Sequence, residues 1–132
     1  MIYLKRKIYN KLVDWKNNDN GQTALLIEGA KRIGKSTIAE EFAKNEYEEY
    51  ILIDFNIAPE EIKNLFIHDR NDIDLILQKL QSYYGKVLPI RKSLIIFDEV
   101  RFCPEARSLI KYLVADGRYD YIETGSLISI KK

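Results

Sequence analysis

The chain has very little of several residue types that carry chemistry or cross-links in other proteins. Among its 132 residues there is one cysteine, Cys103, and one histidine, His68, so neither an intrachain disulfide nor a histidine cluster for a metal can form. A single thiol fits a reducing compartment, and we therefore expect a cytoplasmic protein. No apolar run reaches the length of a membrane span, so we expect no membrane partner.

Charge of one sign is also lacking, because 21 Lys and Arg face 20 Asp and Glu and leave a net charge of +1. This balance gives no overall field that would favour nucleic acid or an anionic surface as a partner. Hydrophobic residues make up 46% of the chain, as in an ordinary globular domain, and the length suits one domain with its own core. We expect a single unit with an N-terminal helix at about 5–17 and a core at about 22–132.

Glycines are few, yet two of them fall in one motif. Residues 29–36 read Gly-Ala-Lys-Arg-Ile-Gly-Lys-Ser, the pattern G-x-x-x-x-G-K-[ST] of a phosphate-binding loop. A strand pattern at 23–28 leads into the motif and a helical pattern at 35–45 leads out of it, which is the context that the loop requires. Backbone N–H groups and the positive end of the helix dipole then bind a phosphate. The sequence therefore predicts a nucleotide-binding core.

The loop residues have separate expected roles. Lys35 carries a full charge for the β- and γ-phosphates, which makes it a candidate catalytic residue, and Ser36 offers a hydroxyl to Mg²⁺. The full set expected to contact the nucleotide is Gly29, Ala30, Lys31, Arg32, Ile33, Gly34, Lys35, Ser36 and Thr37.

A second signal lies at 93–99, where the apolar run Ser-Leu-Ile-Ile-Phe ends in Asp98 and Glu99. A short continuous apolar run is typical of a buried parallel strand, and an acid at its carboxyl end points to where ligands of such sheets bind. We expect Asp98 to hold Mg²⁺ and Glu99 to polarise the attacking water. A helix that begins with acids in its first turn is the alternative, and the phosphate loop upstream favours the catalytic interpretation.

The last strand pattern, at 121–124, runs into Thr124, Gly125 and Ser126. A hydroxyl at this strand end would sit beside the γ-phosphate, so Thr124 and Ser126 are candidate catalytic residues; a plain turn is the alternative. Strands alternate with helices along the chain, which indicates right-handed βαβ units. The predicted fold class is α/β, a three-layer αβα arrangement around a mainly parallel sheet.

These motifs, in this order, resemble the AAA-type P-loop ATPases. More narrowly, they are similar to bacterial and archaeal AAA-type ATPase domains that precede a C-terminal region of unknown function. The resemblance covers essentially the whole chain and implies ATP and Mg²⁺ as cofactors. The family usually has two arginines where this chain has Lys31 and Arg32, and a glutamine where it has Arg101.

The resemblance also implies a sheet order of 5-1-4-3-2, with the phosphate-loop strand inside. The sequence stops soon after the fourth strand pattern, so we expect a domain truncated before strand 5, the helical lid and the arginines that such proteins use in hydrolysis. The strand at 23–28 would then lie at an edge. We expect this edge either to pair with a second copy of the chain or to be covered by the N-terminal helix near Ile8, Leu12 and Trp15.

Taken together, these patterns favour ATP binding with Mg²⁺-dependent hydrolysis to ADP, weak in isolation and faster with the missing C-terminal part. A nucleotide-dependent switch that orders a surface for a partner, without hydrolysis, is the alternative. Adjacent acids disfavour a small-molecule kinase, and the lack of an Asn-Lys-x-Asp motif disfavours a GTPase. The sequence leaves open the base preference and any protein or nucleic-acid partner.

Overall fold

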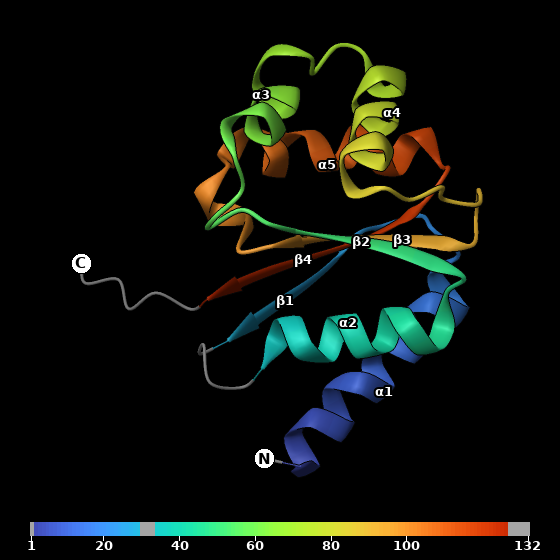
Figure 1. Cartoon of the computed structure of the whole chain (residues 1–132). Helices are drawn as coiled ribbons and strands as arrows, with labels where there is room; N and C mark the ends of the chain where they lie inside the picture. Colours follow the sequence, from blue (N-terminus) through green and yellow to red (C-terminus); the bar gives the residue numbers. More distant parts are fainter. Residues whose placement is uncertain (1, 30–33, 127–132) are drawn as a thin grey trace.

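Helices and strands alternate along the chain as the sequence predicts (Figure 1). The computed structural model describes residues 2–29 and 34–126, and for residues 2–4 and 126 it describes the backbone alone. The strands are β1 (Leu25–Gly29), β2 (Glu49–Asp54), β3 (Ser93–Asp98) and β4 (Asp120–Ser126). The helices are α1 (Ile2–Asp19), α2 (Lys35–Glu46), α3 (Glu60–His68), α4 (Ile73–Tyr84) and α5 (Pro104–Asp116), with a short 3-10 helix η2 (Val100–Phe102).

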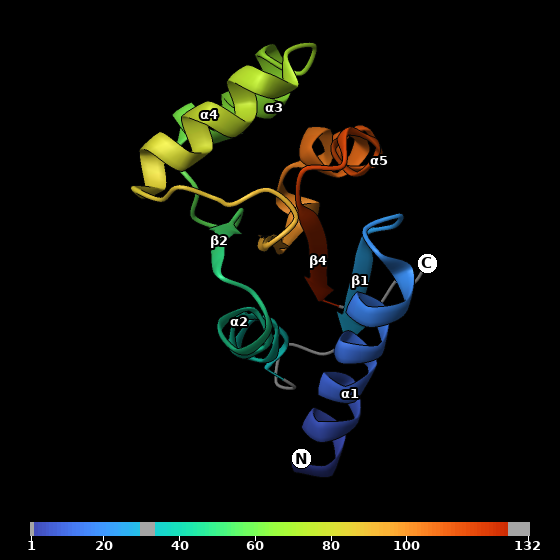
Figure 2. The ribbon, with the colours of Figure 1, turned by 90° about the vertical axis from the view of Figure 1, so that its right-hand side faces the viewer.

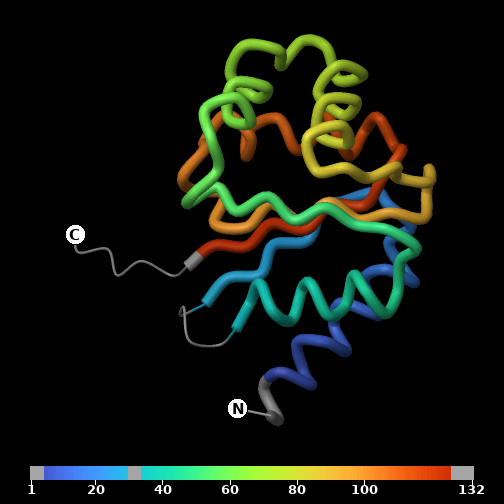
Figure 3. Tube along the Cα trace, viewed as in Figure 1, coloured from blue at the N-terminus to red at the C-terminus, as the bar shows by residue number. Residues whose placement is uncertain are grey.

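The strands form one parallel sheet in the order β1-β4-β3-β2. This order confirms the 1-4-3-2 part of the predicted sheet, since β1 pairs with β4 rather than with the strand that follows it in the chain. The register pairs Ile27 with Thr124, and Asp54 with Asp98. In the trace, β1 and β4 end on the same side of the molecule, close to where α2 begins (Figure 3).

Each face of the sheet has its own hydrophobic core. On one face α1 and α2 pack together, and Leu12 and Phe42 are almost fully buried there against Ile96 of the central strand β3. On the other face α3, α4 and α5 cover Phe97 and Tyr121. Figure 2 shows α1 running beside α2 and β1, with the other three helices across the sheet. The result is the expected three-layer αβα arrangement.

Helix ends follow the sequence closely where a cap or a glycine sets them. Asp72 caps α4 by accepting a hydrogen bond from the N–H of Leu75 at 3.1 Å, and Gly85 ends this helix in a left-handed conformation with φ 66°. The strand β1 begins at Leu25 instead of residue 23, because the N–H of Thr23 donates to the carboxylate of Asp19 at 2.6 Å.

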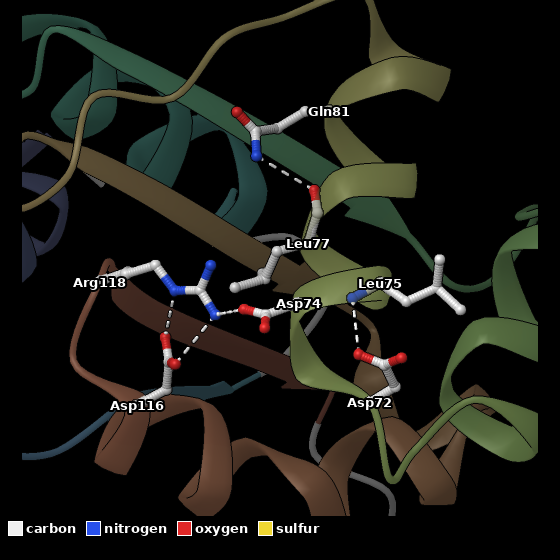
Figure 4. A network of polar contacts seen from close by, with 7 residues as sticks. All are labelled: Asp72, Asp74, Leu75, Leu77, Gln81, Asp116 and Arg118. Atoms are coloured by element: carbon white, nitrogen blue, oxygen red, sulfur yellow. Dashed lines mark hydrogen bonds and ion pairs between the residues drawn. The ribbon is translucent and has the colours of Figure 1, made fainter.

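The start of α4 is also tied to the end of α5 by charge (Figure 4). Arg118 donates to Asp74 at 2.6 Å and to Asp116 at 2.8 Å, so it bridges the two helices. These two carboxylates raise the pKa of Arg118, which stays charged at every accessible pH. The network lies in the layer formed by α4 and α5, and it fastens that layer together.

Candidate nucleotide site

The start of α2 has the geometry that a phosphate loop requires. Gly34, directly before the helix, is left-handed with φ 72° and ψ 41°, a conformation that glycine adopts without a steric cost. Its carbonyl accepts the first helical hydrogen bond from the N–H of Ile38 at 2.9 Å. The predicted loop positions Ala30, Lys31, Arg32 and Ile33 lie outside the described residues, so their expected contacts stay predictions.

Lys35 is the most buried charged residue of this region, with 4% of its surface exposed. Its Nζ donates to the carbonyl oxygen of Gly29 at 3.3 Å, so the side chain turns back toward the start of the loop. The next two residues, Ser36 and Thr37, lie in the first turn of α2, with Ser36 half-buried and Thr37 exposed. The ammonium of Lys35 and the hydroxyl of Ser36, which we expect to contact phosphate and Mg²⁺, therefore both belong to the first turn of α2.

Asp98 and Thr124 meet at the carboxyl ends of the two central strands. The Thr124 hydroxyl donates a short hydrogen bond to Oδ1 of Asp98, and Asp98 is 8% exposed. The same hydroxyl oxygen accepts the N–H of Glu99 at 3.0 Å. One buried hydroxyl thus orients the side chain of one acid and the backbone of the next.

Glu99 leaves the strand in an unusual conformation. Its φ of 52° and ψ of 52° are left-handed, which costs a side-chain-bearing residue of order 1 kcal/mol or more. Asp98 is the last residue of β3, and the left-handed turn at Glu99 follows it directly.

The carboxylate of Glu99 is paired in this structure. Arg101 Nε lies 3.3 Å from Oε1 of Glu99, and the two side chains are 33% and 16% exposed. The Arg101 guanidinium also lies over the ring of Phe102 at 4.3 Å. At the position where the similar proteins usually have a neutral amide, this chain therefore places a cation in contact with the proposed catalytic acid.

A third acid, Asp54, belongs to the same corner and was not singled out from the sequence. It ends β2 directly beside Asp98 in the sheet register. Burial raises the pKa of Asp98, the carboxylates of Asp54 and Glu99 raise it further, and the Thr124 hydrogen bond and Lys35 act against them. The sequence signal that could have identified Asp54 was its position, because it also ends an apolar strand pattern.

The structure gives Thr124 a buried position, since none of its surface is exposed and its hydroxyl serves both acids. The direct contact with a γ-phosphate that we expected stays a prediction, while the contacts of this hydroxyl in the structure are with Asp98 and Glu99. Ser126 is the last residue of β4 and pairs with Gly29 in the register, which brings its backbone beside the start of the loop. The side chain of Ser126 lies outside the described residues.

The residues around Asp98 suit a Mg²⁺ ion that is coordinated partly by the protein and partly by the phosphates of a bound nucleotide. Within the described parts of the chain, no three His, Cys, Asp or Glu side chains are arranged to hold a metal by themselves. Mg²⁺ usually takes one or two carboxylates and completes its shell with phosphate oxygens and water. A buried carboxylate with a raised pKa among like charges, as Asp98 is, gains from a cation beside it.

Two further arginines, Arg107 and Arg118, form ion pairs with carboxylates. Arg118 belongs to the network between α4 and α5, and Arg107 Nε lies 3.7 Å from Oε1 of Glu123. Glu123 is 9% exposed on the sheet face that α5 covers, and burial raises its pKa while Arg107 lowers it. Arg118 precedes β4 and so lies at the opposite end of the sheet from Asp98. Glu123 lies opposite Phe97 in the register, so Arg107 is near the end that carries Asp98, where it forms its ion pair with Glu123.

A parallel αβα sheet, a glycine-lysine turn opening α2, and acids at the end of the neighbouring central strand define a P-loop nucleotide-binding domain. A family model described as an AAA domain matches residues 21–132. The chain therefore belongs to this family, the AAA-type P-loop ATPase domains.

The solved structure of C. elegans PCH-2 is similar over 100% of this chain, with a TM-score of 0.45 and 16% sequence identity. The chain spans 37% of the length of that protein. No curated protein matches the sequence. Within residues 2–29 and 34–126, no helix has the length and apolar character that a membrane span needs.

Proposed function

We propose that this AAA domain binds ATP together with Mg²⁺ and hydrolyses it to ADP and phosphate. The observation that carries the proposal is the chain of hydrogen bonds from Asp98 through Thr124 to the backbone of Glu99. It presents two acids at one strand end, beside the helix that begins at Lys35. Phosphoryl transfer depends mainly on positioning and charge, and these are what such an arrangement supplies.

The roles divide among the residues by chemistry. Lys35 and the first turn of α2 hold the phosphates, while Ser36 and Asp98 hold Mg²⁺, which would neutralise charge on the phosphate oxygens. Glu99 accepts a proton from the attacking water or orients it. Thr124 keeps Asp98 and Glu99 in place from within the sheet.

Binding should be tested before turnover, by calorimetric titration of the chain with ATP, ADP and GTP, with and without Mg²⁺. We expect ATP to bind more tightly with Mg²⁺ than without it. Lys35→Ala should abolish tight triphosphate binding, whereas Lys44→Ala, which removes an exposed charge from the last turn of the same helix, should leave it unchanged. Equal ATP affinity in the parent and in Lys35→Ala would contradict the proposal.

A nucleotide-dependent switch without hydrolysis is the second candidate, and the ion pair between Arg101 and Glu99 favours it. A carboxylate held by a guanidinium is a weaker base toward water. Single-turnover measurements separate the two candidates. A protein that binds ATP with Mg²⁺ and forms no ADP over many hours is a switch, while steady formation of ADP supports the ATPase.

The cytoplasm is the proposed location of the protein, on the basis of its single cysteine. Cys103 is a buried free thiol, which agrees with a reducing cytoplasm where ATP is abundant. ATP and ADP are the proposed small-molecule partners. A second copy of the chain is the proposed macromolecular partner, through the edge of β1, which pairs on one side with β4.

A further inference from the structure

Lys5, near the start of α1, lies next to the last glycine of the phosphate loop. A Cβ built on Gly34 would lie 3.7 Å from Cε and 4.0 Å from Nζ of Lys5, and the next atom, Cβ of Thr37, is also at 4.0 Å. An ammonium group from another helix thus stands beside the turn that opens α2. Among the residues that the structure describes, Lys5 and Lys35 both approach this turn, and they come from different helices of the fold.

The position of α1 is fixed by packing, which makes the approach of Lys5 a property of the fold. Leu12 is 1% exposed in the core beneath α2. One turn after Lys5, the Tyr9 hydroxyl accepts a hydrogen bond from Asn45 at 2.9 Å. The Tyr9 ring also meets the edge of Phe42 with their centres 5.9 Å apart. The side chain of Lys5 is therefore presented from a helix that is docked on α2.

The surroundings of Lys5 are open and leave its charge available. Lys5 and Arg6 line a cavity of about 400 Å³ between α1 and α2, together with Tyr9, Ile38, Glu41 and Asn45. Lys5 is exposed and forms no ion pair with any of the residues that the structure describes. An ammonium without a carboxylate partner, next to a turn that binds anions, has a phosphate oxygen as its natural acceptor.

We propose that Lys5 is a second cation of the nucleotide site, whose ammonium donates to a phosphate oxygen of the bound nucleotide. The inference rests on the proposed function, because it needs a nucleotide on the phosphate loop. It makes α1 a part of the site, although α1 lies outside the sequence motif and outside residues 21–132 that match the family. Bound nucleotide would then fasten the start of α1 to the start of α2.

The test compares two lysines of α1 by calorimetry with ATP, ADP and adenosine at low and high salt. Lys7 is exposed like Lys5 and two residues further on, and it does not line the cavity, so Lys7→Ala removes the same charge away from Gly34. We expect Lys5→Ala to weaken ATP and ADP binding roughly three- to tenfold at low salt, and Lys7→Ala less than twofold. The difference should shrink at high salt and vanish for adenosine.

A second measurement reports on α1 directly. Amide hydrogen exchange in the first turns of α1 should slow when ATP binds to the parent and to Lys5→Arg, but not when it binds to Lys5→Ala. Equal ATP affinities in Lys5→Ala and Lys7→Ala, with the parent binding ATP, would overturn the role of Lys5 and leave the proposed function intact. A parent that binds no nucleotide would overturn both.

Discussion

Thr124 and Asp98 are joined across two neighbouring strands by a buried hydrogen bond in which the hydroxyl donates to the carboxylate. The same hydroxyl accepts the backbone N–H of Glu99, so both acids depend on one side chain of β4. The partner strand therefore holds the carboxylate of Asp98 and the backbone of Glu99.

Thr124→Val removes this hydroxyl and keeps the shape of the side chain. The buried N–H of Glu99 and the carboxylate of Asp98 both lose a partner, so we expect a loss of about 1–3 kcal/mol in the free energy of unfolding. Denaturant titration measures it. Turnover should fall further than ATP affinity, because the acids lose their positions. Thr124→Ser retains the hydroxyl and should keep most of the stability and most of the turnover. A Thr124→Val variant with the turnover of the parent would contradict the role of Thr124 in positioning the acids.

Asp98→Asn should make the nucleotide-free fold more stable at neutral pH while weakening its response to Mg²⁺. The buried carboxylate has like charges beside it, and an Asn side chain can still accept the hydrogen bond from Thr124. We expect a gain of about 1 kcal/mol, or roughly 3–5 °C in Tm by thermal unfolding. A variant that is less stable than the parent at neutral pH would show that the carboxylate is well compensated.

The pH dependence of this difference follows from the raised pKa of Asp98. The folded state holds the proton more tightly than the unfolded state, so this group favours folding below the ordinary range for aspartate. As the pH rises from that range through the raised pKa, the parent loses stability relative to Asp98→Asn. Denaturant titrations of both proteins from pH 3 to pH 8 measure it. Asp54→Asn removes a neighbouring negative charge that raises the pKa of Asp98. This variant should therefore lose stability over a narrower range of pH than the parent does.

Arg101→Gln should raise the rate of ATP hydrolysis about two- to fivefold, because the Glu99 carboxylate is no longer held in a half-buried ion pair and is free to act on water. Steady-state release of phosphate measures this rate. Lys111→Gln, which removes an exposed cation from α5, should leave it unchanged. Glu99→Gln should lower it by a factor of about 10² or more with ATP affinity retained. A slower Arg101→Gln would mean that the guanidinium assists the reaction.

The edge of β1 should mediate self-association at high protein concentration. Leu26, in the middle of this edge strand, is 37% exposed, and neighbouring β1 residues are also apolar. Leu26→Lys should reduce the apparent mass in light scattering, since a charge on an edge strand opposes pairing with another chain. Tyr112→Lys replaces a similarly exposed apolar residue on α5, away from the edge, and serves as the control. A parent that stays monomeric would contradict the prediction.

Local patterns in the sequence were sufficient to predict the helices and strands. They also identified the candidate residues of the phosphate loop and of the strand that ends in Asp98. The apolar run before Asp98, the capping Asp72 and the terminating Gly85 each act within a few residues, and the structure has an element boundary at each of them. The alternation of strands and helices predicted a parallel αβα sheet because crossovers of parallel strands are almost always right-handed. The neighbours of β1 came from the resemblance to a family.

What the sequence alone could not provide are contacts between residues far apart in the chain. The pairing of Asp98 with Thr124 joins positions 26 residues apart, and Lys5 reaches Gly34 from another helix. The left-handed turn at Glu99 could not be predicted from the sequence, because the residue is not a glycine. The sequence by itself determined which chemical groups are present and on which elements they lie. Only the packing of α1 and α2 against the four strands of the sheet decided which of those groups share a site, because such proximity depends on tertiary contacts that no local pattern encodes.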